Sequence, residues 1–386
     1  MKICLLNNIY PPFDRGGGSE QVTANLAQGL QQAGHEIVII STRPVNQPDP
    51  QIANHYYLAS YFPLLHTLPK SLRLLWHLRD MFCIIKLLRV RKILLKEKCD
   101  LIISNNLMGL GHLVPRLATA NQPWVHILHD AQLLHPSGLL YWGQEKIIDS
   151  LLAKLYQVWN SWCFKKVSLI ISPSHWLLQL HQSKKLFGSA KQIQLFNPIN
   201  LTEKSESRQP SATFNFLSVG QIVQHKGIAV LLRAWSELNQ RLGDKQSRVK
   251  LIMIGTGPWL TSAQSLAKDQ TNLEWLGKLP NAEVHNIMRQ SHCLIVPSLT
   301  YENSPTVVFE AYNNNLPVIG SNLGGLQELL TESAGFTAND STTLGSKMIA
   351  AMSHYADWQT ELQAQKQKIK PLTPVEYLEI IMEEMK

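Results

Sequence analysis

The sequence is short of cysteines and has no cysteine pair. Its five cysteines are scattered, without a Cys-x-x-Cys motif: Cys4, Cys83, Cys99, Cys163 and Cys293. An odd, dispersed set argues against a disulfide framework or a cysteine zinc site, and it is typical of a reducing compartment. The 14 histidines show no His-Glu-x-x-His or similar metal spacing. We therefore expect no protein-bound metal.

Long apolar runs are also missing. No stretch of 18 mainly apolar residues is present, so we expect no transmembrane helix. The apolar run near the start, within residues 1–6, is too short for a signal peptide. These absences predict a cytoplasmic protein, soluble or peripheral on a membrane. The 386 residues, 45% of them hydrophobic, are enough for two or three domains with cores of their own.

Acidic residues are scarce in one segment. The net charge is +8, and residues 70–98 contain nine basic and two acidic side chains, so that 9 − 2 = +7 lies there. The basic residues are Lys70, Arg73, Arg79, Lys86, Arg89, Arg91, Lys92, Lys96 and Lys98, and the acidic ones are Asp80 and Glu97. The positive charge is therefore local.

The first 40 residues have the pattern that opens a nucleotide-binding α/β domain. An apolar strand at 2–7 precedes a loop that ends in Gly16, Gly17 and Gly18. Ser19 can cap a helix over 20–32, and a second strand is expected at 37–40. Glycines allow a backbone to approach a diphosphate closely. The loop is not Gly-x-Gly-x-x-Gly, and a plain tight turn is the alternative.

Residues 41–68 read as irregular, and residues 71–98 read as one basic amphipathic helix. Its apolar side consists of Ile84, Leu87, Leu88, Leu94 and Leu95, and Arg79, Lys86, Arg89 and Lys96 lie roughly opposite. Such a helix can lie on an anionic membrane surface. An ordinary crossover helix with a solvated basic face is the alternative. No nucleic-acid motif accompanies the charge.

Polar residues follow a predicted strand at 124–128. His129 and Asp130 come directly after it, where parallel sheets bind their ligands. The earlier His126, on the strand itself, is expected to be packed. A helix over 145–166 carries Trp159, Trp162 and Phe164, for which we expect core positions, with an acceptor or membrane edge as the alternative. Residues 201–213 are polar and rich in turn formers, as in a linker.

Residues 293–325 read as strand, turn, helix, strand and glycine turn. Ser304 suits an N-cap and Pro305 the first helical position, so that the amides of Thr306 and the next two residues are free for an anion. Glu302 lies in the turn, and Glu310 lies two helical turns further on. Carboxylates accept hydrogen bonds from sugar hydroxyls. A solvated turn glutamate and a helix-surface glutamate are the alternative.

This stretch resembles the Glu-x7-Glu signature of family 4 retaining glycosyltransferases. It reads Glu302-Asn303-Ser304-Pro305-Thr306-Val307-Val308-Phe309-Glu310. The resemblance implies that Glu302 contacts the sugar of the donor and that Glu310 holds its ribose. It also implies the GT-B fold, in which two Rossmann-like α/β domains with parallel sheets face across a cleft.

Further motifs share the resemblance. The loop Gly16–Gly18 resembles the family's glycine loop, and His129 the histidine near the donor sugar. In 220–227 Lys226 matches the lysine that grips the diphosphate, but Gln221 stands where the family has an arginine, which removes one cation. Gly255 resembles the glycine of the family's Gly-x-Gly-Pro turn.

The resemblance implies three segments and a reaction. Residues 1–198 would bind the acceptor, 199–365 the nucleotide sugar, and 366–386 would form a helix that crosses back to the first domain. The reaction is a metal-independent sugar transfer from a UDP or GDP donor to a glycan or lipid-linked acceptor, with no cofactor and no nucleic acid. Cell-surface polysaccharide or glycolipid assembly fits the basic segment at 70–98.

Two other functions stay open from the sequence. Because Gln221 weakens the grip on a diphosphate, the same fold could be a nucleotide-sugar-binding scaffold or partner subunit. A phosphorylase or epimerase of this fold is the third, although no pyridoxal-lysine motif is visible. Neither the sugar, the acceptor nor the oligomeric state can be read from the sequence.

Overall fold

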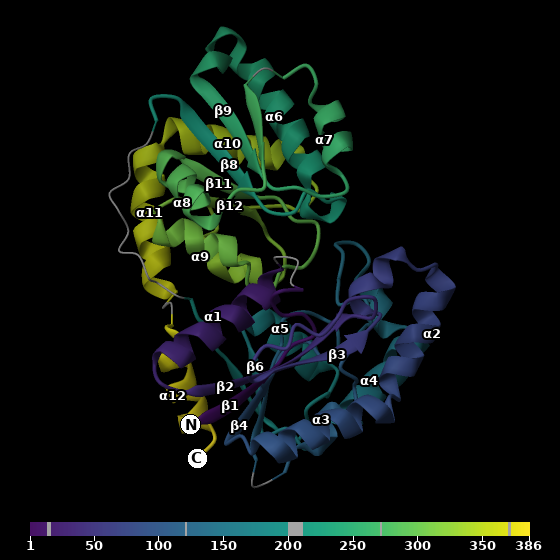
Figure 1. Cartoon of the computed structure of the whole chain (residues 1–386). Coiled ribbons are helices and arrows are strands. Elements are labelled where there is room, and N and C mark those ends of the chain that lie inside the picture. Colours follow the sequence, from purple (N-terminus) through teal and green to yellow (C-terminus); the bar gives the residue numbers. More distant parts are fainter. Residues whose placement is uncertain (14–16, 120–121, 200–210, 271, 370–371) are drawn as a thin grey trace. The chain divides into compact units, whose positions relative to one another are not determined.

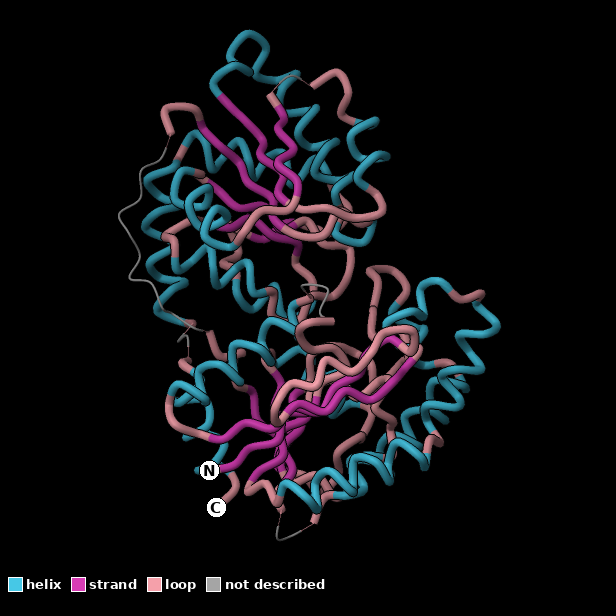
Figure 2. The backbone as a smooth tube through the Cα atoms, viewed as in Figure 1, coloured by secondary structure: helices cyan, strands magenta, loops and turns pink. Residues whose placement is uncertain are grey.

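The computed structural model describes residues 1–386 except 14–16, 120–121, 200–210, 271 and 370–371. The chain divides into two compact units (Figure 1). Unit 1 consists of Met1–Leu139, Lys146–Leu201 and Pro371–Lys386, and unit 2 of Leu140–Glu145 and Thr202–Lys370. Figure 2 shows strands at the centre of each unit with helices around them. The predicted pair of parallel-sheet α/β domains is confirmed.

Unit 1 contains a parallel sheet of seven strands among its described residues, in the order β3-β2-β1-β4-β5-β6-β7. The strands are β1 (Lys2–Leu6), β2 (Glu36–Pro44), β3 (His55–Ser60), β4 (Leu101–Ser104), β5 (Trp124–Ile127), β6 (Leu169–Ser172) and β7 (Lys191–Gln194). The helices are α1 (Gly18–Gln32), α2 (Lys70–Met81), α3 (Ile84–Glu97), α4 (Leu151–Phe164), α5 (His175–Ser183) and α12 (Pro374–Glu384), with 3₁₀ turns η1 (Phe62–Thr67), η2 (Val114–Leu117) and η3 (Glu145–Asp149). The strand order reverses between β1 and β4.

The two faces of this sheet are covered by different helices. On one face, Leu26 and Leu30 of α1 and Tyr377 and Ile381 of α12 share a core with alternate residues of the strands, and α1 and α12 lie side by side (Figure 1). A capping box formed by Thr373 and Glu376 opens α12. On the opposite face His126, buried as expected, contacts the Phe164 ring of α4 at 4.7 Å between ring centroids.

Unit 2 contains a parallel sheet of six strands in its described part, in the order β10-β9-β8-β11-β12-β13. The strands are β8 (Phe214–Val219), β9 (Val249–Ile254), β10 (Leu273–Gly277), β11 (Cys293–Val296), β12 (Val318–Ser321) and β13 (Gly335–Phe336). The helices are α6 (Ile228–Leu242), α7 (Leu260–Leu266), α8 (Asn281–Gln290), α9 (Thr306–Asn313), α10 (Ser341–Ser353) and α11 (Tyr355–Lys368), with 3₁₀ turns η4 (Gln224–Lys226), η5 (Gly243–Arg248) and η6 (Gly324–Leu329). The order reverses between β8 and β11, which is the switch point where sheets of this type bind ligands.

Several predicted elements differ from the structure. The stretch 41–68, expected to be irregular, contains the end of β2 and the edge strand β3. The helix predicted over 71–98 is two helices, broken at Phe82 and Cys83. The helix predicted over 145–166 begins only at Leu151, after the turn η3, with the Ser150 side chain as its cap.

The face of α3 that packs against the rest of unit 1 also differs from the prediction. Val90 and Leu94 are buried, whereas Ile84, Leu88 and Leu95 of the predicted apolar side are exposed. Val90 is not one of the residues of the predicted apolar side. Both acidic residues of segment 70–98 form ion pairs within unit 1. Asp80 pairs with Lys86, and Glu97 pairs with Lys2 and Lys96.

One short segment of the predicted first domain, residues 140–145, belongs to unit 2. Residues 140–145 pair with the loop after β11, because the Trp142 amide donates to the Leu299 carbonyl and the Tyr301 amide to the Leu140 carbonyl. Most of the predicted linker 201–213 lies outside the described residues. Within the described residues, none of the helices combines the length and apolar character needed to span a bilayer.

Candidate active site

An ion pair lies at the switch point of unit 2. Lys226 is in the loop after β8, and Glu302 is in the loop after β11, the neighbouring strand. Lys226 Nζ lies 2.6 Å from Glu302 Oε1. The two predicted catalytic residues of this unit therefore contact one another directly.

The surroundings of Glu302 favour its charged form. Burial by itself would raise its pKa, but the Lys226 ammonium and the hydrogen bonds from Lys226 and Ser298 outweigh burial and hold the pKa below the usual value. Ser298 Oγ donates to Oε1 at 2.6 Å, the same oxygen that Lys226 contacts. Among the described residues no donor is found for Oε2, which can accept from ligand hydroxyls.

A glycine sets the position of Lys226. Gly227 has φ +71°, and a Cβ there would lie 1.7 Å from the Pro297 carbonyl oxygen. Only glycine allows this close approach, which brings the loop after β8 against the end of β11. The Leu299 amide then donates to the His225 carbonyl at 2.8 Å. The two loops are therefore joined immediately beside the ion pair.

The predicted turn at Gly255 supports the same loop from the other side. The Ile222 amide donates to the Thr256 carbonyl at 3.0 Å. A Cβ on Gly255, at φ +137°, would lie 1.8 Å from the Gly220 carbonyl oxygen. Gln221, between these contacts, is exposed. The uncharged side chain at the family's arginine position therefore lies on the surface of this loop.

The start of α9 differs in detail from the prediction. Pro305 is the N-cap, and the first helical residue is Thr306, so Ser304 does not cap the helix. Ser304 Oγ is instead buried with no hydrogen-bond partner among the described residues. The Val308 amide, expected to be free, donates to the Pro305 carbonyl at 3.0 Å. Those of Thr306 and Val307 have no acceptor within the described part of the chain.

Glu310 lies further along α9 without a described partner. Burial raises the pKa of its carboxyl group. No hydrogen bond or ion pair joins this carboxyl group to any residue that the structure describes, which is unusual for a half-buried acid. Asn303, also predicted for this site, is buried. The carboxyl group of Glu310 can therefore accept hydrogen bonds from a ligand.

In unit 1, His129 lies at the end of β5 and is held by Asn105. Its Nε2 lies 3.0 Å from Asn105 Oδ1, and Asn105 Nδ2 donates to Thr23 Oγ1 of α1 at 2.8 Å. Burial lowers the pKa of His129 to about 4, so the ring is neutral at pH 7. The Asn105 amide oxygen facing Nε2 favours the tautomer that is protonated on Nε2.

Asp130 is the next residue and is stabilised differently. Burial raises its pKa to about 6, although hydrogen bonds from the Gln132 amide and the Asn106 side chain oppose this effect. Asn106 Nδ2 also lies 3.4 Å from Ser19 Oγ. The end of β5 is thus connected to the start of α1 through the residues that follow β4.

The predicted glycine loop is described only in part. Gly17 is the N-cap of α1, which begins at Gly18, so Ser19 does not cap this helix. The Gly17 amide donates to the Glu20 carboxylate at 3.2 Å. Gly16 lies outside the described residues.

Sequence reasoning missed Asn105 and Asn106. Both follow β4 directly, at the carboxyl end of a strand beside the switch point of unit 1. The same signal drew attention to His129 and Asp130 after β5. Applied to every strand of the sheet, it would have found all four residues.

The family of the chain follows from comparison with known proteins. Residues 16–202 match the family model described as Glycosyltransferase Family 4, and residues 201–363 match the model of Glycosyl transferases group 1. The chain belongs to the family 4 glycosyltransferases. The predicted family is thus confirmed, and the two matches meet at the junction of the units.

Relatives of this glycosyltransferase cover most of its length. It is 26% identical over 345 residues to an uncharacterized 42.6 kDa protein in the cps region of Klebsiella pneumoniae, covering 85% of this chain and 87% of the relative. It is 24% identical over 365 residues to the putative teichuronic acid biosynthesis glycosyltransferase TuaC of Bacillus subtilis, covering 85% and 83%. The structure of Anabaena HepE in complex with UDP and glucose matches with a TM-score of 0.68 at 16% identity, covering 99% and 98%. The fold is GT-B.

Proposed function

We propose that this glycosyltransferase moves a sugar from a nucleotide-diphosphate donor to an acceptor hydroxyl with retention of anomeric configuration. The observation that carries the proposal is the Lys226–Glu302 pair at the switch point of unit 2. Glu310, whose carboxyl group has no partner among the described residues, lies on the helix that follows. A cation, a carboxylate with one open oxygen and a second open carboxylate are the groups that a diphosphate, a sugar and a ribose require.

Each residue has a defined part in the proposed reaction. Lys226 and the open amides of Thr306 and Val307 stabilise negative charge on the departing diphosphate. Glu302 accepts hydrogen bonds from the donor sugar through Oε2, and Glu310 accepts from the ribose hydroxyls. The charge on the leaving group is met by the protein's own donors, so the proposed transfer requires no metal ion and no cofactor.

The names of the relatives support a place in cell-surface polysaccharide or glycolipid assembly. TuaC is named for teichuronic acid biosynthesis, and the Klebsiella relative is encoded in a cps region. The HepE structure contains UDP and glucose, so UDP is the first nucleotide to test, before GDP. We propose a glycan or lipid-linked acceptor at the inner face of the plasma membrane, with the basic segment 70–98 on the anionic surface.

Calorimetric titration with UDP, GDP and ADP tests the donor site. We expect one nucleotide to bind. Titration with different sugar derivatives of that nucleotide then identifies the donor. NMR of the first product, recorded before it equilibrates, shows its anomeric configuration and tests retention. The reaction rate in excess EDTA tests whether the transfer is independent of metal ions. If none of the three nucleotides binds at millimolar concentration, the donor assignment is wrong and the scaffold function is favoured.

A further inference from the structure

A row of large apolar side chains is exposed along α4 of unit 1. Leu151, Leu155, Val158 and Trp162 recur at intervals of four, three and four residues, which places them on one face of the helix. Leu151 is 74%, Leu155 60% and Val158 69% exposed. The opposite face holds the buried Tyr156 and Cys163 among other residues of α4. We call the four exposed residues the α4 stripe.

The α4 stripe is connected to Phe82, an exposed residue at the break between α2 and α3. Phe82, at the break between these helices, lies 4.5 Å from the Trp159 ring, and that ring lies 5.3 Å from Trp162 between centroids. The exposed apolar side chains of α2 and α3 are Leu72, Leu74, Leu75, Leu78, Ile84, Ile85, Leu88 and Leu95. So many exposed large apolar side chains on three helices of one unit indicate a contact site, because soluble monomers rarely expose large apolar patches.

Exposed basic residues lie on the same helices as these apolar side chains. On α4 and directly after it, Lys154, Lys165 and Lys166 are exposed. On and beside α2 and α3 the exposed basic residues are Arg79, Arg89, Arg91, Lys92, Lys96 and Lys98. The acidic residues of that segment, Asp80 and Glu97, are buried in ion pairs. The surface therefore presents apolar and cationic groups together.

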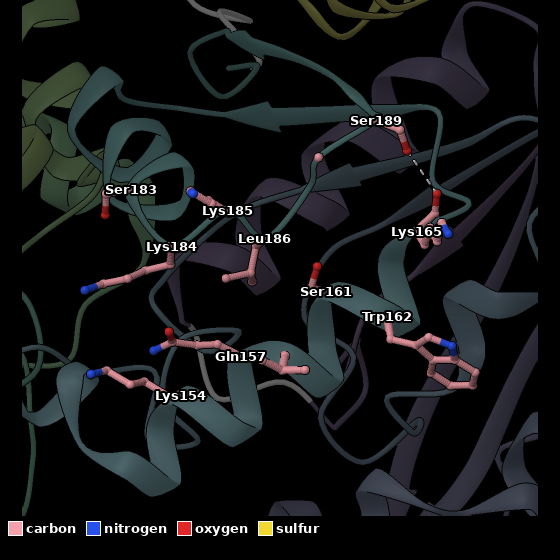
Figure 3. A pocket seen from close by; sticks show the side chains of 12 residues that line it. Lys154, Gln157, Ser161, Trp162, Lys165, Ser183, Lys184, Lys185, Leu186 and Ser189 are labelled. Carbon is pink, nitrogen blue, oxygen red and sulfur yellow. Dashed lines mark hydrogen bonds between the residues drawn. The ribbon is translucent and has the colours of Figure 1, made fainter.

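A pocket of about 700 Å³ opens beside the α4 stripe and shares Val158 and Trp162 with it. Four lysines line the pocket: Lys154, Lys165, Lys184 and Lys185. Figure 3 shows Lys154 and Lys184 at one end of the pocket and Lys165 near Trp162 at the other. Asp149 neutralises Lys184 in an ion pair. Of the other three lysines, Lys154 interacts with Asp149 through its charge, whereas Lys165 and Lys185 have no acid partner among the described residues. Lysines without a neutralising acid suit the binding of a phosphate group.

We propose that the α4 stripe docks on an anionic phospholipid bilayer and that the lysine-lined pocket binds the phosphates of its headgroups. The apolar residues enter the boundary between headgroups and acyl chains, and the basic residues of the same helices meet the anionic lipids. A second copy of the chain is a poor occupant, because a symmetric pair would bring two sets of cations together. The inference rests on the proposed lipid-linked acceptor and extends its membrane contact from residues 70–98 to α4.

Co-sedimentation of the full chain with vesicles tests the stripe. We expect binding to phosphatidylcholine vesicles that contain a quarter phosphatidylglycerol, and little binding to phosphatidylcholine alone. Leu155→Glu should weaken the binding at least tenfold. The matched control is Leu266→Glu on α7 of unit 2, where the side chain is 61% exposed. Equal loss in both variants, or equal binding by Leu155→Glu and wild type, would overturn the proposal.

A second pair of variants tests the pocket. Lys185→Glu should lower binding to the anionic vesicles several-fold, whereas the control Lys245→Glu, an exposed lysine of unit 2, should not. Inorganic phosphate at ten millimolar, with ionic strength held constant, should compete only weakly with a multivalent lipid surface. Full displacement by phosphate would show a free-phosphate site and overturn the headgroup assignment.

Two further measurements separate this inference from the proposed function. Leu155→Glu should still bind the nucleotide that wild type binds, since α4 belongs to unit 1 and the donor residues to unit 2. Vesicle binding without any nucleotide binding would overturn the proposed function and keep the membrane site. Sedimentation velocity without lipid should show a monomer, and a dimer that Leu155→Glu dissociates would overturn the membrane site in favour of a second copy.

Discussion

Lys226 and Glu302, 76 residues apart in the chain, form an ion pair of 2.6 Å between Nζ and Oε1 in unit 2. Their side chains are 35% and 15% exposed, so the pair is partly shielded from water. Each residue has a proposed partner in the donor, the diphosphate for Lys226 and the sugar for Glu302. In the absence of a donor, each therefore neutralises the other.

Replacing one member of this pair should reduce both stability and activity. Lys226→Gln leaves the Glu302 carboxylate shielded without its cation, so we expect a lower melting temperature. Loss of one charge-stabilising donor should reduce kcat by about 10²- to 10³-fold. The double variant Lys226→Gln/Glu302→Gln should recover stability but not turnover. Thermal scanning fluorimetry and initial rates measure the two effects.

The control for that series is another ion pair of the same unit. Lys250 and Glu274 join β9 and β10, and both side chains are about 40% exposed. Lys250→Gln should change neither kcat nor melting temperature much, because exposed pairs contribute about 0–1 kcal/mol. A turnover by Lys226→Gln equal to that of Lys250→Gln would remove Lys226 from the proposed mechanism.

Glu310 should be needed for nucleotide binding but not for the fold. Glu310→Ala should weaken binding of the nucleoside diphosphate about 10- to 100-fold, since two hydroxyl hydrogen bonds to a charged acceptor are lost. The melting temperature without ligand should stay the same or rise, because burial already disfavours the charge and raises the pKa of this group. Calorimetry measures the affinity.

Glu283→Ala is the matched control for Glu310. Glu283 is an exposed acid in the first turn of α8, the helix that precedes β11. We expect unchanged affinity in this variant. Comparable losses in both variants would indicate a general effect of charge on the anionic ligand instead of a ribose contact.

The apolar strands of both sheets were predictable because both of their faces are buried. Parallel strands covered by helices read as short runs of Leu, Ile and Val, as in β4, β6 and β11. The edge strand β3, His-Tyr-Tyr-Leu-Ala-Ser, is half-buried and has no such run. The break between α2 and α3 contains neither glycine nor proline, so the sequence gives no signal for it.

The candidate site was predictable as separate motifs but not as contacts. The sequence showed Lys226 and Glu302 in two loops, and only the strand order places those loops side by side at the switch point. Trp162 of the α4 stripe was expected in the core but is exposed, because apolar spacing alone does not show whether a helix face is covered. The links from Asn105 to Thr23 and His129 depend on three distant segments.

Restoring the family's arginine should strengthen donor binding. Gln221 is exposed in the loop that leads to Lys226, so Gln221→Arg adds a cation at little cost to the fold. A charge-assisted bond is roughly twice as strong as a neutral one, and solvent screening reduces the gain. We expect about 3- to 10-fold tighter binding of the nucleoside diphosphate, and a smaller effect for Gln224→Arg, an exposed position in the same loop. Equal gains in the two variants would indicate non-specific attraction.

The carboxyl group of Asp130 should make stability depend on pH. Its pKa is raised to about 6, above the usual 3.8, mainly by burial. A group whose pKa is raised in the folded state favours folding below its unfolded pKa, and that contribution is lost as pH rises from about 4 to about 6. The cost at neutral pH is at most about 3 kcal/mol, because a tenfold change in proton affinity is worth about 1.4 kcal/mol.

Asp130→Asn should therefore stabilise the chain at pH 7.5 and have little effect at pH 4, where the native carboxyl group is protonated. His129 acts in the opposite direction: its pKa is lowered to about 4 by burial, so its contribution is lost as pH falls below about 6.5 in both proteins. Calorimetric melting at the two pH values measures the difference. Asp149→Asn, at an exposed acid paired with Lys184, should not stabilise at either pH. A lower melting temperature for Asp130→Asn at pH 7.5 would mean that the Gln132 amide stabilises the carboxylate more than burial opposes it.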